Sequence, residues 1–298
     1  MEYNADLMLE GGGMRCAFTV GVLDFFLDKK IEFPYVATAS AGALIGSSYI
    51  AKQRERNHSL LTEMVKNRDF ISFRRMLRNK ELFSMDFIFN KLAVELFPLD
   101  FQSFAQSKSK FIIGTTDVNT GTPMFYDTFN HEDDLLRIIM ASCSLPVLAP
   151  SVPYKDKELM DGGVSDPIPI KPLIDRGLKK HVVVLTRNKG YVKKATKLSW
   201  FFKRYFKDQP ELIKLLQNRH IMYNRTMQKL LEMEQRNEVF IIQPEEPLAA
   251  SRIEKNNQKL EKLYIQGYQE AERKSEALLE FLKATQKPSV TINENLSS

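Results

Sequence analysis

Residues 3–42 decide the fold, and they read YNADLMLEGGGMRCAFTVGVLDFFLDKKIEFPYVATASAG. The apolar run at 3–10 predicts a short strand, and three glycines then break the chain before a helical pattern begins. Residues 35–39 predict a second strand that leads directly into a second helix. The face of the first helix is marked by residues at helical spacing, which are Met14, Phe18, Gly21, Val22 and Phe25.

The alternation of strands and helices continues along the chain. Further strands are expected at 110–118, 181–186 and 239–243, and a helix is expected at 132–142. The run at 181–186 is rich in β-branched residues, which is typical of a strand covered on both faces. This alternation predicts an α/β fold in three layers, with a mostly parallel central sheet and helices on both faces.

The remaining segments add helices to this core. We expect a core at 1–190 with a helical insertion at about 57–108, and a mainly helical C-terminal region at 191–286 that completes the core. Within that region a long amphipathic helix is expected from residue 252 to 284. The polar tail at 287–298 is expected to be flexible.

Composition excludes several protein classes. The 298 residues are 43% hydrophobic with a net charge of +6, which is ordinary for a globular protein and excludes disordered and fibrous chains. The two cysteines, Cys16 and Cys143, fit a reducing compartment. The first residues lack the basic start and apolar run of a signal peptide, so we expect a cytoplasmic protein.

The glycine loop after the first strand is the first candidate site. It comprises Gly11, Gly12, Gly13, Met14 and Arg15. Glycines leave backbone N–H groups uncovered next to the positive end of a helix dipole, and such a loop binds anions. It would hold either the pyrophosphate of a dinucleotide or the oxyanion that forms when an ester carbonyl is attacked. A tight turn without a ligand is the alternative.

The turn after the second strand carries Ser40, between Thr38 and Gly42. A serine on a strand-to-helix turn is exposed in a strained conformation, which suits a nucleophile. A dinucleotide fold would instead place an acid at the end of this strand, where the chain has Thr38 and Ala39. A simple helix N-cap is the other interpretation of Ser40.

A nucleophilic serine needs a base, and Asp161 is the second part of the hypothesis. The turn expected at 155–157 places Asp161 at the end of a returning strand, although Asp-Gly is also a strong hairpin-turn signal. Both interpretations of Asp161 stay open on this pattern. Histidine, the more usual base, stands in no glycine-rich or turn-rich setting at any of its four positions, His58, His131, His181 and His220.

Taken together, the three sites resemble the patatin-like phospholipases, a family of lipid acyl hydrolases with a serine–aspartate dyad. The resemblance covers residues 5–187 well and the remainder loosely. Cys16 departs from the family, which usually has glycine there, and we expect it to crowd the first helix against the sheet. Thr38 also stands where the family has glycine, and we expect it to tighten the elbow. The matching segments are the oxyanion loop at 11–15, the nucleophile elbow at 39–43, the segment at 141–146 before the aspartate, and the aspartate motif at 161–163.

The resemblance implies a mechanism in which Asp161 accepts the proton of Ser40. The Ser40 hydroxyl oxygen then attacks an ester carbonyl, and water hydrolyses the resulting acyl-enzyme. Backbone N–H groups of Gly11 to Met14 would hold the oxyanion, and Arg15 would donate further hydrogen bonds or brace the loop. No cofactor and no metal are implied. The expected substrate is a lipid or a small ester, and the rival functions are dinucleotide binding and lipid binding without catalysis.

Residues 193–207 predict a membrane contact. They carry six basic residues, no acid and five aromatic residues, a mixture that favours the surface of an anionic membrane. We therefore expect a peripheral membrane contact, the alternative being a helix that packs its aromatic rings on the core. Nucleic acid is not expected as a partner, because no RNA-binding signature accompanies this segment.

Overall fold

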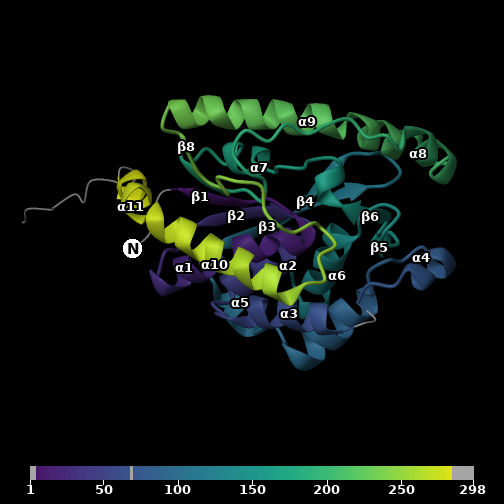
Figure 1. The fold of residues 1–298 in the computed structure, drawn as a ribbon, viewed down its shortest axis with the longest axis horizontal. Coiled ribbons are helices and arrows are strands. Elements are labelled where there is room, and N and C mark those ends of the chain that lie inside the picture. The colour runs from purple at the N-terminus through teal and green to yellow at the C-terminus, as the bar shows by residue number, and fades with distance from the viewer. Residues whose placement is uncertain (1–4, 68–69, 284–298) are drawn as a thin grey trace, which may run out of the picture.

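The computed structural model describes residues 5–67 and 70–283, and its centre is an eight-stranded sheet (Figure 1). The strand order is β5-β6-β3-β2-β1-β7-β8, with β4 also paired to β3. The five strands from β3 to β8 in this order are parallel, whereas β4, β5 and β6 join antiparallel. The expected mostly parallel sheet is confirmed, and its strands are β1 (Asp6–Leu9), β2 (Tyr35–Ala39), β3 (Lys110–Asp117), β4 (Pro123–Tyr126), β5 (Val152–Tyr154), β6 (Lys157–Asp161), β7 (His181–Val184) and β8 (Val239–Ile242).

Helices cover both faces of the sheet, as expected (Figure 1). One face carries α7 (Lys171–Ile174) and α9 (Pro210–Gln235). Before α9 the chain forms the short helix α8 (Ser199–Tyr205). The opposite layer holds a short 3₁₀ turn at Gly13–Cys16, then α1 (Ala17–Asp28), α2 (Ala41–Ile50), α6 (Glu132–Cys143) and α10 (Asn257–Arg273).

Four helical segments fill the stretch between α2 and β3. Three are α-helices and one is a π-helix. They extend the layer of α1 and α2 away from the sheet (Figure 1). They are α3 (Arg56–Lys66), α4 (Phe73–Asn79), the π-helix Phe87–Leu96 and α5 (Phe101–Gln106).

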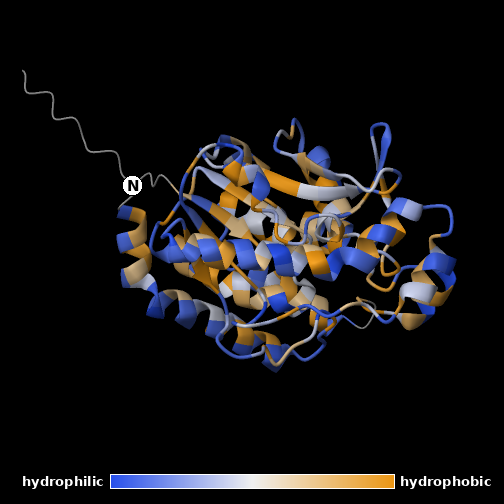
Figure 2. Cartoon of the chain, turned by 90° about the horizontal axis from the view of Figure 1, so that it is seen from above, coloured by the Kyte–Doolittle hydropathy of each residue, from blue (hydrophilic) through white to orange (hydrophobic). Residues whose placement is uncertain are grey.

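Alternation along the strands divides the core between the two faces. Leu7 and Leu9 of β1 belong to the larger cluster under α1 and α2, whereas Met8 between them packs with Tyr223 and Leu230 of α9. This follows from the period of two along a strand. Apolar residues accordingly concentrate in the central strands, and the polar residues lie on the outer faces of the helices (Figure 2).

Helices α1 and α10 pack backbone against backbone. A Cβ atom on Gly267 would lie 1.9 Å from the carbonyl oxygen of Phe18, and a Cβ atom on Gly21 would lie 2.0 Å from that of Tyr264. Only glycine at these two positions permits such an approach. The C-terminal helix is thereby fixed on the first helix of the chain.

One expected helix is wrong. The stretch from residue 252 to 284 forms two helices, α10 and α11 (Ser275–Lys283), and begins as a loop. Asn256 caps α10 by accepting a hydrogen bond from the Lys259 amide. Lys274 ends α10, and its ammonium group donates to the carbonyl of Ile241 on the sheet. The expected tail at 287–298 lies outside the described residues, and within those residues no helix has the length and apolar character needed to cross a membrane.

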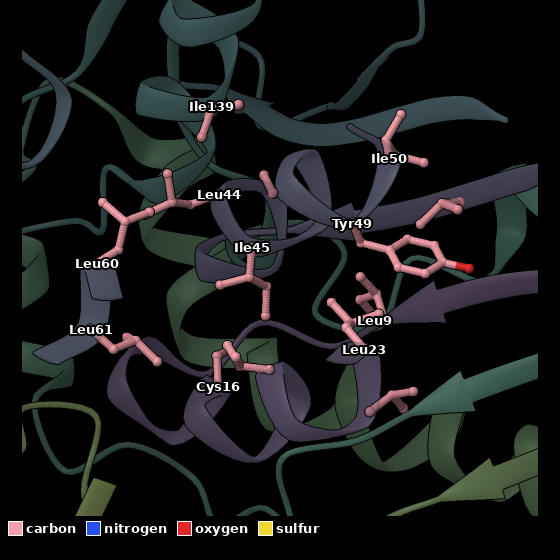
Figure 3. Close-up of a cluster of buried hydrophobic side chains, with 14 of the residues drawn as sticks. Leu9, Cys16, Leu23, Leu44, Ile45, Tyr49, Ile50, Leu60, Leu61 and Ile139 are labelled. Atoms are coloured by element: carbon pink, nitrogen blue, oxygen red, sulfur yellow. The ribbon is translucent and has the colours of Figure 1, made fainter. Parts of the chain in front are cut away.

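Cys16 lies in the apolar core at the start of the first helix, and its crowding of that helix stays a prediction. Its side chain is fully buried among Leu23, Ile45 and Leu61 (Figure 3), and its thiol lies 3.8 Å from the Glu10 carbonyl. Burial raises the pKa of this thiol to about 12. Cys16 is therefore an apolar packing residue at this position.

Candidate active site

The glycine loop and Ser40 lie side by side because their strands are parallel neighbours. Leu9 of β1 pairs with Thr38 of β2, so the turns that follow the two strands meet at one edge of the sheet. A Cβ atom on Gly11 would lie 2.5 Å from the Cβ of Ser40. Glycine at this position therefore brings the loop into direct contact with the serine.

Ser40 adopts a strained backbone conformation. Its φ of 59° and ψ of −142° lie outside the regions that non-glycine residues favour, at a cost of about 1–3 kcal/mol. Ser40 occupies the N-cap position of α2, but its side chain makes no capping hydrogen bond, so capping does not account for its hydroxyl. The Ser40 amide donates to the Ser142 hydroxyl at 2.8 Å, and that hydroxyl donates to the Gly114 carbonyl at 2.7 Å. Ser142 thus holds the elbow to β3.

The elbow is tight at the positions that flank Ser40. A Cβ atom on Gly42 would lie 2.2 Å from Thr38 Oγ1, so the threonine side chain fills the space that a larger residue at 42 would need. Thr38 is fully buried, and its hydroxyl has no hydrogen-bond partner in the described part of the chain.

Ser40 and Asp161 are brought together across the site. The Ser40 hydroxyl donates to Asp161 Oδ2 at 2.6 Å, and the other carboxylate oxygen accepts from the Gly163 amide at 2.8 Å. The Asp161 backbone is held too, by a hydrogen bond from its amide to Ser144 and one from Thr116 to its carbonyl. The carboxylate therefore has a fixed position.

Asp161 ends β6 of the hairpin β5–β6, as the expected turn near residue 156 requires. The Asp-Gly pair is not itself a hairpin turn, because Asp161 begins a short 3₁₀ turn at Gly162–Val164. A Cβ atom on Gly162 would lie 2.2 Å from the Gly114 carbonyl oxygen. The glycine is needed for close approach to β3.

Burial makes Asp161 a better base. Its side chain is 1% exposed, and desolvation raises its pKa above the ordinary value of 3.8. Four smaller influences lower the pKa again, namely the hydrogen bond from Ser40, the charges of Arg219 and Arg252, and the Gly163 amide. A carboxylate with a raised pKa accepts a proton more readily near neutral pH.

The glycines of the loop line the cavity, whereas the Met14 amide is hydrogen-bonded elsewhere in the chain. Gly11, Gly12 and Gly13 line one small cavity together with Ser40 and Asp161. The Met14 amide instead donates to the Arg252 carbonyl at 3.2 Å. In this structure Met14 is thus occupied within the chain, and the role of Gly11 to Gly13 in holding an oxyanion stays a prediction.

Arg15 points away from this cavity. Its guanidinium is buried, and one nitrogen lies 3.5 Å from Thr186 Oγ1, whose hydroxyl and amide both donate to Glu10. Burial, followed by the charges of Arg187 and Arg252, lowers the Arg15 pKa to about 10. Of its two expected roles, this geometry matches bracing of the loop against the end of β7.

The sequence did not indicate two arginines that line this cavity. Arg219 of α9 donates to the Gly163 carbonyl, and Arg252 lies in the loop before α10. Burial, and then the charge of Arg252, lowers the Arg219 pKa to about 10. No local motif marks either residue, because only the fold brings them to Ser40.

No histidine is hydrogen-bonded to Ser40 within residues 5–67 and 70–283. His58 pairs with Glu261, His181 with Asp6, and His220 contacts the carbonyl of Gln217. In the same part of the chain no group of three or more His, Cys, Asp or Glu side chains is placed to hold a metal ion.

An apolar cavity of about 120 Å³ opens beside Ser40. It extends between α2 and the helical segments that precede β3. Its walls include Leu44, Ile45, Phe70, Phe83, Phe89 and Leu148.

Comparisons with known proteins identify the family of the chain. The model of the Patatin-like phospholipase family matches residues 7–174, and that of a domain of unknown function, DUF6363, matches residues 209–283. The uncharacterized protein YjjU of Escherichia coli strain K12 is 28% identical over 254 residues, which cover 81% of this chain and 69% of YjjU. VipD from Legionella pneumophila shares 12% identity and a TM-score of 0.45, over 94% of this chain and 67% of VipD. Because the first match spans more than half of the sequence, the chain belongs to the patatin-like phospholipase family.

Proposed function

We propose that the protein is a serine acyl hydrolase that cleaves carboxylic esters of lipids. The observation that carries this proposal is the 2.6 Å hydrogen bond from the Ser40 hydroxyl to the Asp161 carboxylate. Family membership supports the reaction class, and the strained elbow supports the choice of nucleophile.

The reaction proceeds in two half-reactions. Ser40 Oγ attacks the ester carbonyl while its proton passes to Asp161, and the oxyanion forms beside the glycine loop. The tetrahedral intermediate expels the alcohol, which takes the proton from Asp161, and leaves an acyl group on Ser40. Water then attacks this acyl-enzyme and gives a proton to Asp161, and Asp161 returns the proton to Ser40 Oγ as the carboxylic acid leaves.

The apolar cavity beside Ser40 supports a lipid substrate. Its aliphatic and aromatic walls provide a place for an acyl chain next to the attacking oxygen.

A fluorophosphonate probe with mass-spectrometric mapping tests the proposal. Ser40 is expected to be labelled, and Ser40→Ala is expected to abolish both labelling and hydrolysis of a short-chain ester. Ser47→Ala is the matched control, because Ser47 lies in α2, the helix that follows Ser40, and its hydroxyl donates only to the Leu44 carbonyl. Labelling that persists in Ser40→Ala would overturn the proposal. Liposome binding without any hydrolysis would favour a non-catalytic lipid binder, and saturable NAD(P) binding that is indifferent to Ser40→Ala would favour a dinucleotide-binding protein.

We also propose that the protein contacts anionic membranes peripherally through α4 and α8. Neither helix has a buried residue, and Phe73, Leu77 and Trp200 are 68%, 86% and 69% exposed. Both helices lie at the end of the molecule away from α11 (Figure 1), where the Lys80 ammonium lies 5.2 Å from the ring centre of Tyr205.

Within the segment at 193–207, some aromatic residues match the core-packing interpretation and others match the membrane interpretation. Phe206 is buried and packs with Leu212, as the core-packing alternative requires, whereas Trp200 faces outward. Exposed apolar side chains among basic residues match the surface of an anionic bilayer. The basic residues on and next to the two helices include Arg74, Arg78, Lys80, Lys197, Lys203 and Arg204.

Flotation with vesicles that contain phosphatidylserine tests the membrane contact. The variant with Phe73, Leu77 and Trp200 all changed to serine is expected to lose flotation. Ile221→Ser, an exposed residue of α9, is the matched control and is expected to float like the unmodified protein. Undiminished flotation of the triple variant would remove this surface as the contact.

A further inference from the structure

A second, larger cavity adjoins the dyad and has a basic wall. Its volume is about 540 Å³, and it shares Leu145, Arg219 and Arg252 with the small cavity that contains Ser40 and Asp161. The other polar residues of its lining are Lys193, Lys194, Thr196 and His220. The rest is mostly apolar and includes Val147, Leu148, Val164, Phe201, Phe202 and Leu216.

Among the basic residues of this wall, Lys193, Arg219 and Arg252 have no carboxylate partner within 4 Å in the described residues. Arg219 donates to a backbone carbonyl, and the Lys193 ammonium lies 5.1 Å from the ring centre of Tyr223. The nearby acids are already engaged, because Glu10 accepts from Thr186 and Asp161 accepts from Ser40 and Gly163.

Basic side chains gathered this closely repel one another, and the carboxylates of Glu10 and Asp161 offset only part of that repulsion. Burial, followed by the charges of Arg219, Arg252 and Arg187, lowers the pKa of Lys193 to about 7. An anion bound among these groups would relieve the repulsion and make charge-assisted hydrogen bonds with them. This cluster of basic side chains therefore favours a ligand that carries negative charge.

We propose that Lys193, Arg219 and Arg252 form a subsite for a phosphate group on the alcohol side of the ester substrate. This inference rests on the proposed function, because it assigns to the same reaction a preference for esters whose leaving alcohol carries phosphate. The apolar cavity beside Ser40 takes the acyl chain and the larger cavity with the basic wall takes the phosphate, with Arg252 lining both cavities.

The subsite gives a role to the C-terminal region. Arg219 and Arg252 both lie within residues 209–283, the match to the domain of unknown function, and Lys193 lies just before it. None of the three lies within residues 7–174, the patatin-like match. The C-terminal region therefore supplies substrate recognition to a dyad that the first part of the chain carries.

The test compares two soluble short-chain esters whose alcohols differ only in a phosphate group, so that vesicles play no part. The ratio of kcat/KM for the phosphate-bearing ester to that for the neutral ester is expected to exceed one. Arg252→Gln and Lys193→Gln are each expected to lower this ratio by about 10- to 100-fold, the range expected for the loss of a charge-assisted hydrogen bond. The Arg252 backbone carbonyl that holds Met14 remains in the first variant.

Arg225→Gln is the matched control, because it makes the same charge change on the exposed side of α9 and is expected to leave the ratio as it is. A ratio near one in the unmodified protein, with Ser40 labelled and the neutral ester hydrolysed, would overturn the subsite and leave the proposed function intact. If Ser40 is not labelled and neither ester is cleaved, the proposed function fails. In that case the subsite is tested by measuring binding of inorganic phosphate and of the intact phosphate-bearing ester to the Ser40→Ala protein. Binding of the ester that Arg252→Gln weakens supports it, and binding of free phosphate alone, or of neither, overturns it.

Discussion

Removal of the Ser142 hydroxyl is expected to loosen the Ser40 elbow. This hydroxyl accepts the Ser40 amide at 2.8 Å and donates to the Gly114 carbonyl at 2.7 Å, and Ser142 is fully buried. Ser142→Ala leaves both backbone groups without this partner in a dry site. A buried polar group without a partner costs about 1–3 kcal/mol, so two such groups predict a loss of about 2–6 kcal/mol in the free energy of unfolding.

The activity of Ser142→Ala is expected to fall as well. The strained backbone of Ser40 persists only while its surroundings hold it, and the Ser142 bond is one of the contacts that do so. A displacement of the nucleophile by about 1 Å commonly costs about 100-fold in rate. We therefore expect fluorophosphonate labelling of Ser40 to slow by about 10- to 100-fold, measured alongside urea unfolding.

Ser144→Ala is the control for this experiment. Ser144 is also fully buried and lies only two residues away, but its hydroxyl donates only to the Met140 carbonyl, and its own carbonyl still receives the Asp161 amide after the change. We expect a loss of about 1 kcal/mol and a nearly unchanged labelling rate. Equal labelling rates for the two variants would refute the positioning role of Ser142.

Three further predictions concern single residues. Asp161→Asn is expected to abolish labelling yet to stabilise the protein at pH 7. Burial raises the folded-state pKa of this carboxyl above its unfolded value, so the ionised form opposes folding above the raised pKa; urea unfolding should show the advantage shrinking towards zero as the pH falls to about 4, and a variant less stable at pH 7 would contradict this reasoning. Gly267→Ala is expected to lower the free energy of unfolding by about 1–3 kcal/mol because of the contact with Phe18, although helix propensity alone favours alanine by about 1 kcal/mol; Lys262→Ala on the exposed side of α10 is the control, and stabilisation by Gly267→Ala would count against the close packing. Cys16 is expected to resist alkylation by iodoacetamide at pH 8 until the protein unfolds, since its pKa is raised to about 12; rapid modification in the native state, detected by mass spectrometry, would contradict its burial.

The sequence was sufficient for the central architecture because strands and helices leave local patterns. The apolar run at residues 35–39 matches β2 (Tyr35–Ala39), and the β-branched run from His181 became a strand covered on both faces. The end of α10 could not be predicted in this way. Lys274 is a good helix former, and its bond to the Ile241 carbonyl depends on a contact that exists only after folding.

The candidate site divides in the same way. Ser40 and Asp161 stand in or next to short motifs whose glycines indicate that two backbone segments pack closely. The structure shows this close packing, of Gly11 against Ser40 and of Gly162 against Gly114. No glycine motif of this kind marks Ser142 or Arg219 in the sequence. A serine near the end of a helix and an arginine in a helix of mixed charge are common in any sequence, and their positions at the site depend on packing between distant segments.

The packing of α10 on α1 connects the C-terminal region to the chemistry. Gly21 and Gly267 hold the two helices at backbone contact, and the loop that leads into α10 is thereby laid across the glycine loop that leads into α1. In that position the Arg252 carbonyl accepts the Met14 amide, while its side chain lines the cavity of the dyad. One loop therefore fixes the shape of the expected oxyanion site and contributes charge to it. Substitutions that separate α10 from α1 should consequently alter activity as well as stability, even though both glycines lie outside the cavity.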